Sequence, residues 1–189
     1  PGESLLMSIV LRPPIPSGLA PQLSLVAAVA VVDALGSAGV TATIRWPNDV
    51  MAGNRKICGM LPEARTTREG TLEHVILGIG LNVNQRDFPA SIRTLATSVR
   101  IETGREHAVE AMLHAVLAGL EGWYRHFVEG GLDALLPAWL GRAQGIGRRA
   151  RAADGREGVA VGLAADGALL LRTDSGETVR VVAGEVTTE

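Results

Sequence analysis

One short segment of the chain brings together an amide, a carboxylate, an ammonium group and glycines. Residues 45–61 read RWPNDVMAGNRKICGML. Pro47 fixes the chain direction before Asn48 and Asp49, which places this pair at a strand end, where open α/β sheets bind ligands. An Asn amide can recognise a base or a ribose, and an Asp carboxylate can hold a metal ion or a ribose hydroxyl. Lys56 follows on the far side of a turn, where its ammonium can neutralise a carboxylate or a phosphate.

Glycines interrupt two apolar segments that carry polar residues at their ends. Gly59 lies in the first segment, and Gly78 and Gly80 lie in the second, VILGIGLNVN, which continues through Asn82. A glycine inside a strand weakens it and often marks a bulge or the close approach of a ligand. Each feature alone also fits an ordinary alternative: an Asn-Asp turn, a solvated lysine on an edge strand, or a simple bulge. The residues therefore indicate a small-anion site only when they are read together.

Composition limits the class of protein. A chain of 189 residues suits one main domain with a small appendage, and 47% apolar residues can fill its core. The net charge of −2 argues against a nucleic-acid partner. The single cysteine excludes a disulfide framework within the chain and fits a reducing cytoplasm. The most apolar run, residues 23–35, is too short to span a membrane, and no signal peptide is visible. A strand-like segment follows the first residues directly and there is no initiating Met, so we expect further chain upstream.

Hydrophobic periodicity predicts the elements that position these residues. Strands are expected at 4–11, 41–46, 50–51, 56–61 and 72–83, and helices at 22–35, 106–128 and 132–140. The strands on either side of Ala52-Gly53-Asn54 form a hairpin. Gly130-Gly131 separates the last two helices. Residues 86–104 are expected to form a loop with a short helix near residue 90.

The composition changes near residue 145. Short strand candidates follow at 148–152, 158–163, 168–173 and 178–182. Asp154-Gly155, Asp166-Gly167 and Ser175-Gly176 separate them, and such dipeptides are typical of hairpin turns. This pattern predicts a small β-barrel of four or five strands that packs on the main domain.

In order and spacing, these segments resemble bacterial biotin protein ligases, the biotin–[acetyl-CoA-carboxylase] ligases. The resemblance is carried by RWPNDVMAGNRKICGML, ILGIGLNVN, FPASIRTLATSV and the terminal RVVAGEV, and covers essentially the whole chain. It implies an α+β fold, with a mixed sheet and packed helices in a catalytic domain over residues 1–144 and an SH3-like β-barrel over residues 145–189. Such enzymes form biotinyl-5′-adenylate from biotin and ATP with Mg²⁺, then transfer biotin to a lysine of a biotin carboxyl carrier domain. From the net charge and the short apolar runs we expect no nucleic-acid or membrane partner, and the resemblance implies a cytoplasmic enzyme that can form a homodimer through sheet edges.

The resemblance also assigns roles to individual residues. Lys56 and Asp49 are the implied catalytic residues, with Lys56 contacting the biotin carboxylate and the α-phosphate. The residues expected to bind biotin are Lys56, Gly59, Leu61, Gly78 and Gly80. Those expected on the ATP or adenylate side are Arg45, Asn48, Asp49 and Asn82, with Asp49 also a candidate Mg²⁺ ligand.

Three departures from the family pattern bear on these assignments. The glycine-arginine loop, GRGRxGR in the family, normally precedes the segment that begins this chain. Arg45 stands where the family usually has lysine, which keeps the charge but not the geometry. Pro62 removes a donor from a strand, so the strand is expected to end there or to lie at a sheet edge. A non-catalytic ligand-binding remnant and a related lipoate-type acyl ligase stay open as alternatives. No helix-turn-helix segment is visible to support a repressor role.

Overall fold

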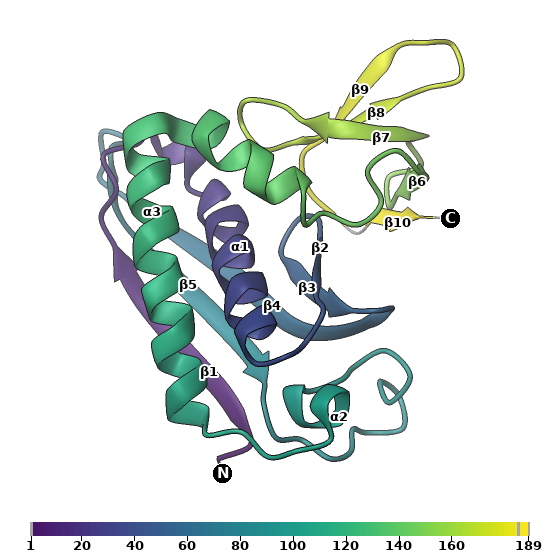
Figure 1. Ribbon diagram of the computed structural model, residues 1–189. Helices are drawn as coiled ribbons and strands as arrows, with labels where there is room; N and C mark the ends of the chain where they lie inside the picture. Colours follow the sequence, from purple (N-terminus) through teal and green to yellow (C-terminus); the bar gives the residue numbers. More distant parts are fainter. Residues whose placement is uncertain (1, 185, 189) are drawn as a thin grey trace.

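Two antiparallel sheets and a pair of long helices make up the chain. The computed structural model describes residues 2–184 and 186–188 (Figure 1). The first sheet has the strand order β1-β5-β4-β3-β2. Its strands are β1 (Ser4–Leu11), β2 (Thr43–Arg45), β3 (Asp49–Ala52), β4 (Arg55–Thr66) and β5 (Leu72–Asn82). The helical elements are η1 (Ser17–Leu19), α1 (Gln22–Ser37), α2 (Val99–Thr103) and α3 (Val109–Leu140).

The predicted α+β class is confirmed, with one correction to the sheet. All pairs of named strands in it are antiparallel, where a mixed sheet was expected. Parallel pairing occurs among the described residues only as two isolated bridges, Ile44 with Ala143 and Lys56 with Ala96. The strand predictions for this domain were otherwise right to within a few residues, apart from β4, which continues to Thr66.

Helix α1 forms the centre of the core because it is apolar nearly all round. It lies between the sheet and α3, and both helices cover the same face of the sheet (Figure 1). At Gly119 of α3 a Cβ would lie 3.3 Å from the carbonyl oxygen of Ala30, so the glycine permits the close approach of the two helices. The segment Ser17–Ser37 is long and apolar enough to cross a membrane, contrary to the sequence-based expectation, but 78% of its most apolar stretch is buried inside the fold. It is therefore used here as a core helix.

The two helices predicted on either side of Gly130-Gly131 run together as α3 with a break. Gly131 has φ 65° and ψ −159°, which no helix interior adopts, so the predicted division is confirmed. The prediction of a short helix near residue 90 is wrong. The helix lies instead at α2, where Ser98 accepts the N-cap hydrogen bond from Ile101 and Gly104, at φ 74°, ends the helix.

Pro62 sits inside β4 rather than at its end. Pairing between β3 and β4 stops at Gly59, while β4 continues beside β5 through Pro62 to Thr66. On its other side Pro62 has no neighbouring strand among the described residues, so the missing N–H donor costs no ladder hydrogen bond. The edge position that the sequence offered as one alternative is the one adopted.

The second sheet follows a short linker and packs on the first domain. Its strands are β6 (Arg149–Ala152), β7 (Glu157–Leu163), β8 (Leu169–Arg172), β9 (Thr178–Val181) and β10 (Val186–Thr188), in the order β10-β6-β7-β8-β9. The three predicted hairpin glycines all have positive φ, as tight turns require, at Gly155, Gly167 and Gly176. Strand β10 was not predicted, and in the described part of the chain no ladder between β9 and β10 closes the expected barrel.

Hydrogen bonds fix the second sheet against the first domain at two places. The linker pairs alongside β2: the amide of Ile44 donates to Arg142 O at 2.8 Å, and the amide of Gln144 donates to Ile44 O at 2.9 Å. Two side chains of the first domain bond the turn before β8. Gln22 Nε2 donates to the carbonyl of Ala165 at 2.8 Å, and Trp46 Nε1 donates to the carbonyl of Gly167. The packing of the small domain on the main one is thus confirmed.

Candidate functional site

The face of the first sheet that points away from the helices is open and apolar. Leu6 is 79% exposed and Leu61 is 58% exposed, although both belong to strands of the central sheet. A groove of about 570 Å³ lies over this face. Its lining residues are Leu6, Met7, Ser8, Asn48, Lys56, Gly59, Met60, Leu61, Gly78, Ile79 and Gly80. Exposed apolar surface in a concave site is typical of a ligand-binding groove.

Glycines leave the floor of this groove without side chains. Gly59, Gly78 and Gly80 come from neighbouring strands, with Gly59 paired to Gly80 and Leu61 paired to Gly78. A Cβ at Gly78 would lie 3.5 Å from Leu61 O, and one at Gly80 would lie 3.5 Å from Leu6 Cδ2. These are ordinary contacts, so packing within the protein does not demand glycine at Gly78 or Gly80. Their effect is to let a flat ligand approach the backbone of β4 and β5.

A cluster of two cations and one carboxylate stands at one end of the groove. Lys56 Nζ lies 2.5 Å from Asp49 Oδ1, and Arg45 NH2 lies 2.7 Å from Asp49 Oδ2. The carboxylate is only 14% exposed, whereas the lysine is 45% exposed and the arginine 40% exposed. The cluster carries one net positive charge and presents its cations to solvent, which suits the binding of an anion.

Lys56 is the only lysine in the 189 residues, against 17 arginines. Of the basic side chains in this chain, it alone ends in a compact ammonium group with three rotatable donors. A side chain of a type that occurs once in the sequence therefore lines the groove.

A second, more polar pocket of about 340 Å³ adjoins the groove at this cluster. It is lined by Arg45, Trp46, Pro47, Asn48, Asp49, Lys56, Gly184, Val186 and Thr187. Asn48 and Lys56 line both cavities. The ammonium therefore stands where an apolar groove and a charged pocket meet, with the last strand of the second sheet forming one wall.

A β-bulge and a neighbouring loop aim Lys56 into this position. Val50 pairs with Cys58 and Met51 with Lys56, so Ile57 is an extra residue in β4. Bulges of this kind redirect side chains. The backbone hydrogen bonds of Lys56 go to the loop before α2: its N–H donates to Leu95 O at 2.7 Å, and its carbonyl accepts from the amide of Thr97 at 2.9 Å.

Gly59 gives the lysine side chain its path across β4. A Cβ on Gly59 would lie 2.9 Å from both Lys56 Cε and Lys56 Nζ, closer than real Cβ atoms approach, and 3.6 Å from Asp49 Oδ1. The absent side chain at Gly59 is therefore required by Lys56 as well as by the open groove.

Two of the predicted nucleotide-side residues use their amides inside the protein. Asn48 Nδ2 donates to Met60 O at 2.8 Å, and Met60 N donates back to Asn48 O at 2.9 Å, which fixes the strand end against β4. Asn82 Nδ2 donates to Thr97 O at 2.9 Å. Asn48 still lines both cavities, whereas Asn82 supports the loop beside Lys56 and lines neither.

Asp49 does not fit a bound Mg²⁺ ion in this arrangement. Both of its oxygens already lie within 2.7 Å of a cationic nitrogen. Within residues 2–184 and 186–188, no group of three or more His, Cys, Asp or Glu side chains is arranged to hold a metal ion. The carboxylate is better placed to orient the two cations than to ligate a metal.

Cys58 lies behind the site and is not exposed to it. The side chain is buried, and burial raises the pKa of its thiol to about 12, an effect that the nearby Lys56 ammonium only partly offsets. A thiol with this pKa is protonated at neutral pH and is not a nucleophile. The prediction that Cys58 is a small core residue is confirmed by its burial.

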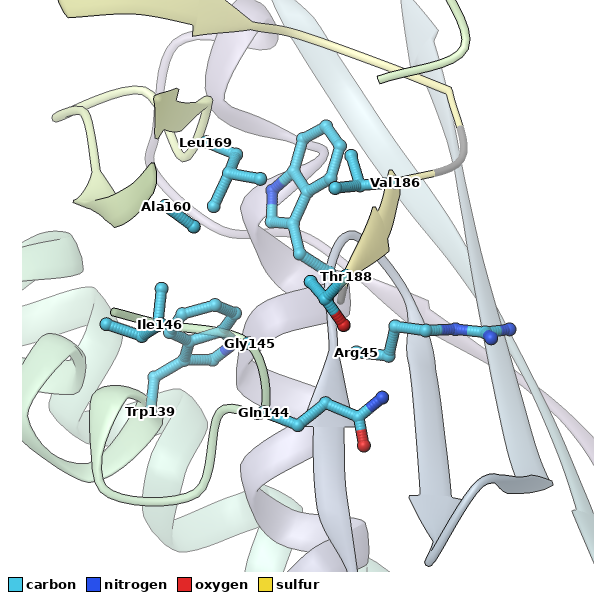
Figure 2. Close-up of a pocket in the computed structure, with 10 residues that line it drawn as sticks. Arg45, Trp139, Gln144, Gly145, Ile146, Ala160, Leu169, Val186 and Thr188 are labelled. Atoms are coloured by element: carbon cyan, nitrogen blue, oxygen red, sulfur yellow. The ribbon is translucent and has the colours of Figure 1, made fainter. Parts of the chain in front are cut away.

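The seam between the two domains contains a much smaller cavity. Figure 2 shows it between Trp139 at the end of α3, the linker at Gln144 and Gly145, and Leu169 of the second sheet. Its volume of about 20 Å³ is close to that of one solvent molecule, far below what a metabolite needs. The seam is therefore a packing interface, and ligand binding belongs to the groove and the adjoining pocket.

Sequence reasoning missed two contributions to the site. The first is the loop before α2 that pairs with Lys56, although the Ser98 cap and Gly104 stop were visible signals of the helix that anchors it. The second is the wall formed by Val186 and Thr187 of β10. The spacing of residues along a chain carries no signal for such a contact between distant segments.

Comparisons with known proteins agree in naming one family. Residues 1–82 match the family described as Biotin/lipoate A/B protein ligase family, and residues 145–187 match the Biotin protein ligase C terminal domain. The Biotin--[acetyl-CoA-carboxylase] ligase of Paracoccus denitrificans is 33% identical, over 98% of this chain and 80% of its own. The Bifunctional ligase/repressor BirA of Bacillus spizizenii is 38% identical over 93% of this chain. This chain spans only 55% of that relative's length.

Solved structures extend the similarity to three dimensions. A crystal structure of biotin protein ligase from Aquifex aeolicus superposes with a TM-score of 0.86 at 27% identity, covering 99% of this chain and 83% of that one. A second structure of the Aquifex enzyme, in complex with biotin and ATP, gives a TM-score of 0.82 at 25% identity, covering 99% of this chain and 78% of that one.

Proposed function

The chain belongs to the biotin protein ligase family, and we propose that it activates biotin with ATP and transfers it to a lysine of a biotin carboxyl carrier domain. One observation supports this above the others. Lys56 Nζ stands at the junction of an apolar groove with a glycine floor and a polar pocket, and it lines both. A reaction that joins a carboxylate on an apolar body to a nucleotide phosphate needs a cation at such a junction.

The groove suits biotin. Its glycine floor accepts the planar ureido ring of the fused bicyclic head, and the exposed Leu6 and Leu61 offer apolar contact to that head and its side chain. The biotin carboxylate then points toward Lys56. ATP takes the adjoining pocket, with its α-phosphate toward the same ammonium and Arg45 beside the phosphates. Asn48 and Asp49 hold the two cations and the strand end in place.

The first chemical step brings two anions into contact. A carboxylate oxygen of biotin attacks the α-phosphorus of ATP, an O–P bond forms, and pyrophosphate leaves with the electrons of the broken bond. The Lys56 ammonium offsets the repulsion between carboxylate and phosphate; one charge pair at 4 Å is worth about 1 to 4 kcal/mol at effective dielectric constants of about 80 to 20. No step requires the ammonium to lose its proton.

The second step transfers the biotinyl group. The neutral amine of a carrier lysine attacks the carbonyl carbon of biotinyl-5′-adenylate and a C–N bond forms. The C–O bond of the anhydride breaks, AMP leaves with that oxygen, and the nitrogen releases a proton to water. The open side of the groove beside Leu61 and Leu6 gives the carrier lysine access. We assign the reaction to the cytoplasm, where a free thiol such as Cys58 stays reduced.

Biotin-dependent exchange of pyrophosphate into ATP tests the proposal. We expect exchange in the protein and its loss in Lys56→Ala, with unchanged thermal unfolding because the side chain is half exposed. Arg65→Ala is the matched control, since it removes a basic side chain from the same strand outside the groove. Wild-type exchange in Lys56→Ala rejects the assignment of Lys56.

Assays on the same purified protein distinguish two alternative functions. Exchange supported by lipoate and not by biotin identifies a lipoate-type acyl ligase, to which the family match over residues 1–82 also extends. Calorimetric binding of biotin without any exchange identifies a non-catalytic binding module.

A further inference from the structure

The backbone of Lys56 lies between Met51 of β3 on one side and a short loop segment on the other. Its N–H donates to Leu95 O at 2.7 Å and its carbonyl accepts from Thr97 N at 2.9 Å, so both of its backbone hydrogen bonds go to the loop. The direction of the ammonium therefore depends on where residues 95–97 lie. Leu95 is 60% exposed, so this segment cannot owe its place to burial at that end.

Thr97 anchors the segment at its other end. Its side chain is fully buried. Its carbonyl accepts from Asn82 Nδ2 at 2.9 Å, and its hydroxyl donates to Glu102 Oε1 at 2.5 Å. A hydrogen bond from a buried hydroxyl to a carboxylate is of the strong, charge-assisted kind.

The same oxygen of Glu102 also binds the residue that precedes the lysine. Arg55 NH2 lies 2.7 Å from Glu102 Oε1. The carboxylate is 23% exposed and comes from α2, which the Ser98 cap fixes at its start. One carboxylate oxygen thus links β4, through Arg55, to the loop beside Lys56, through Thr97.

We propose that Glu102 is a positioning residue for Lys56, acting through Arg55 and Thr97. Its carboxylate locks the loop segment 95–97 against the bulge, so that the ammonium points to the junction of groove and pocket before any substrate binds. The catalytic use of that ammonium rests on the proposed function, whereas the positioning itself does not. Displacement of a reacting group by about 1 Å can cost on the order of 100-fold in rate.

Four variants in the full protein separate positioning from general stability. Glu102→Ala removes both hydrogen bonds, and Thr97→Val removes the hydroxyl at nearly constant volume. Thr97→Ser restores the hydroxyl. Glu121→Ala is the matched control, since Glu121 pairs with Arg125 at 3.1 Å on the exposed face of α3, remote from the groove.

The steady-state constants of exchange give the first readout. We expect Glu102→Ala and Thr97→Val to raise the KM for biotin and to lower kcat, each by about tenfold or more. Thr97→Ser and Glu121→Ala should stay within about twofold of wild type. A purely structural role predicts a lower unfolding midpoint and a smaller active fraction with an unchanged KM, and that result overturns the proposal.

A second readout does not depend on activity. Since Lys56 is the only lysine of these residues, limited acetylation with acetic anhydride and peptide mass spectrometry reports its reactivity directly. We expect severalfold faster acetylation in Glu102→Ala, because an ammonium that is no longer held against Asp49 is more accessible. An unchanged rate overturns the positioning role. If acetylation responds while wild-type protein shows no exchange, the proposed function fails and the positioning role stands.

Discussion

Gly59→Ala is the substitution that most directly probes how the ammonium is placed. The new Cβ would lie 2.9 Å from Lys56 Cε and from Nζ, and no backbone atom lies among its close neighbours. Gly59 has no left-handed φ, so alanine fits the backbone. The only atoms that must move are the flexible end of the lysine. The fold should therefore survive, and loss of chain entropy in the unfolded state can even add about 0.4 to 1 kcal/mol of stability.

The cost should fall on catalysis. To reach an ordinary contact of at least 3.4 Å, the lysine end must shift by at least 0.5 Å, and the 2.5 Å contact of Nζ with Asp49 must lengthen or turn. A displacement approaching 1 Å at a reacting group corresponds to about 10- to 100-fold in kcat/KM, or about 1.4 to 2.8 kcal/mol. Gly59→Ala should thus be as stable as wild type and at least tenfold less active.

The assay pairs biotin-dependent pyrophosphate exchange with thermal unfolding. Gly122→Ala on α3 is the control, because it makes the same chemical change where a Cβ meets nothing within 4 Å. Biotin affinity by calorimetry then tests how far Gly59 acts through the lysine: in a Lys56→Ala background the added Gly59→Ala should cost less than it costs alone, with the remainder due to the groove floor. Full activity in a stable Gly59→Ala protein, or additive losses in the double variant, would refute the reasoning.

Three further predictions concern the ammonium, the seam and the thiol. Lys56→Arg should keep the charge and still lose at least tenfold in exchange, because a planar guanidinium cannot occupy the path over Gly59; near-normal exchange would contradict this. Gly167→Val should lower the unfolding midpoint by several degrees, since its φ is +87° and its Cβ would lie 3.2 Å from Leu25 Cδ1; an unchanged midpoint would contradict the packing of the seam. The pKa of Cys58 is raised by burial from 9.0 to about 12, so the unfolded state alone ionises between these values. The free energy of unfolding, measured by denaturant titration, should therefore fall above pH 9 by up to about 1.4 kcal/mol per pH unit. A Cys58→Ala protein whose free energy of unfolding falls equally steeply with pH would contradict this.

Local patterns predicted most of the fold because local chemistry decides it. The alternation in β1 and β5 and the apolar stripe of α3 report directly which face is buried. The break at Gly131 and the turn at Gly167 follow from the backbone freedom of glycine. These signals leave out strand direction, so they could not correct the mixed sheet that the family resemblance implied, where the structure has antiparallel pairs.

The site was only partly predictable for the same reason. Lys56, Asp49 and Gly59 belong to one hairpin, so their meeting follows from the local turn. Asn82 was placed with the nucleotide, yet its amide bonds the carbonyl of Thr97. Its partner lies fifteen residues further along the chain, and no periodicity predicts which of several polar groups a buried amide will bond.

The sequence has one lysine and 17 arginines, and the two side chains differ in how their orientation is fixed. A guanidinium is a rigid planar group whose orientation is largely set by its plane, and Arg45 contacts one oxygen of Asp49 through one of its nitrogens. An ammonium on four rotatable carbons has no such preference, so its surroundings must supply the direction. Gly59 supplies the path, Asp49 the contact, and the loop before α2 the backbone register. The three constraints converge on one atom, Lys56 Nζ, and a Cβ at Gly59 would disturb the Asp49 contact as well as the path.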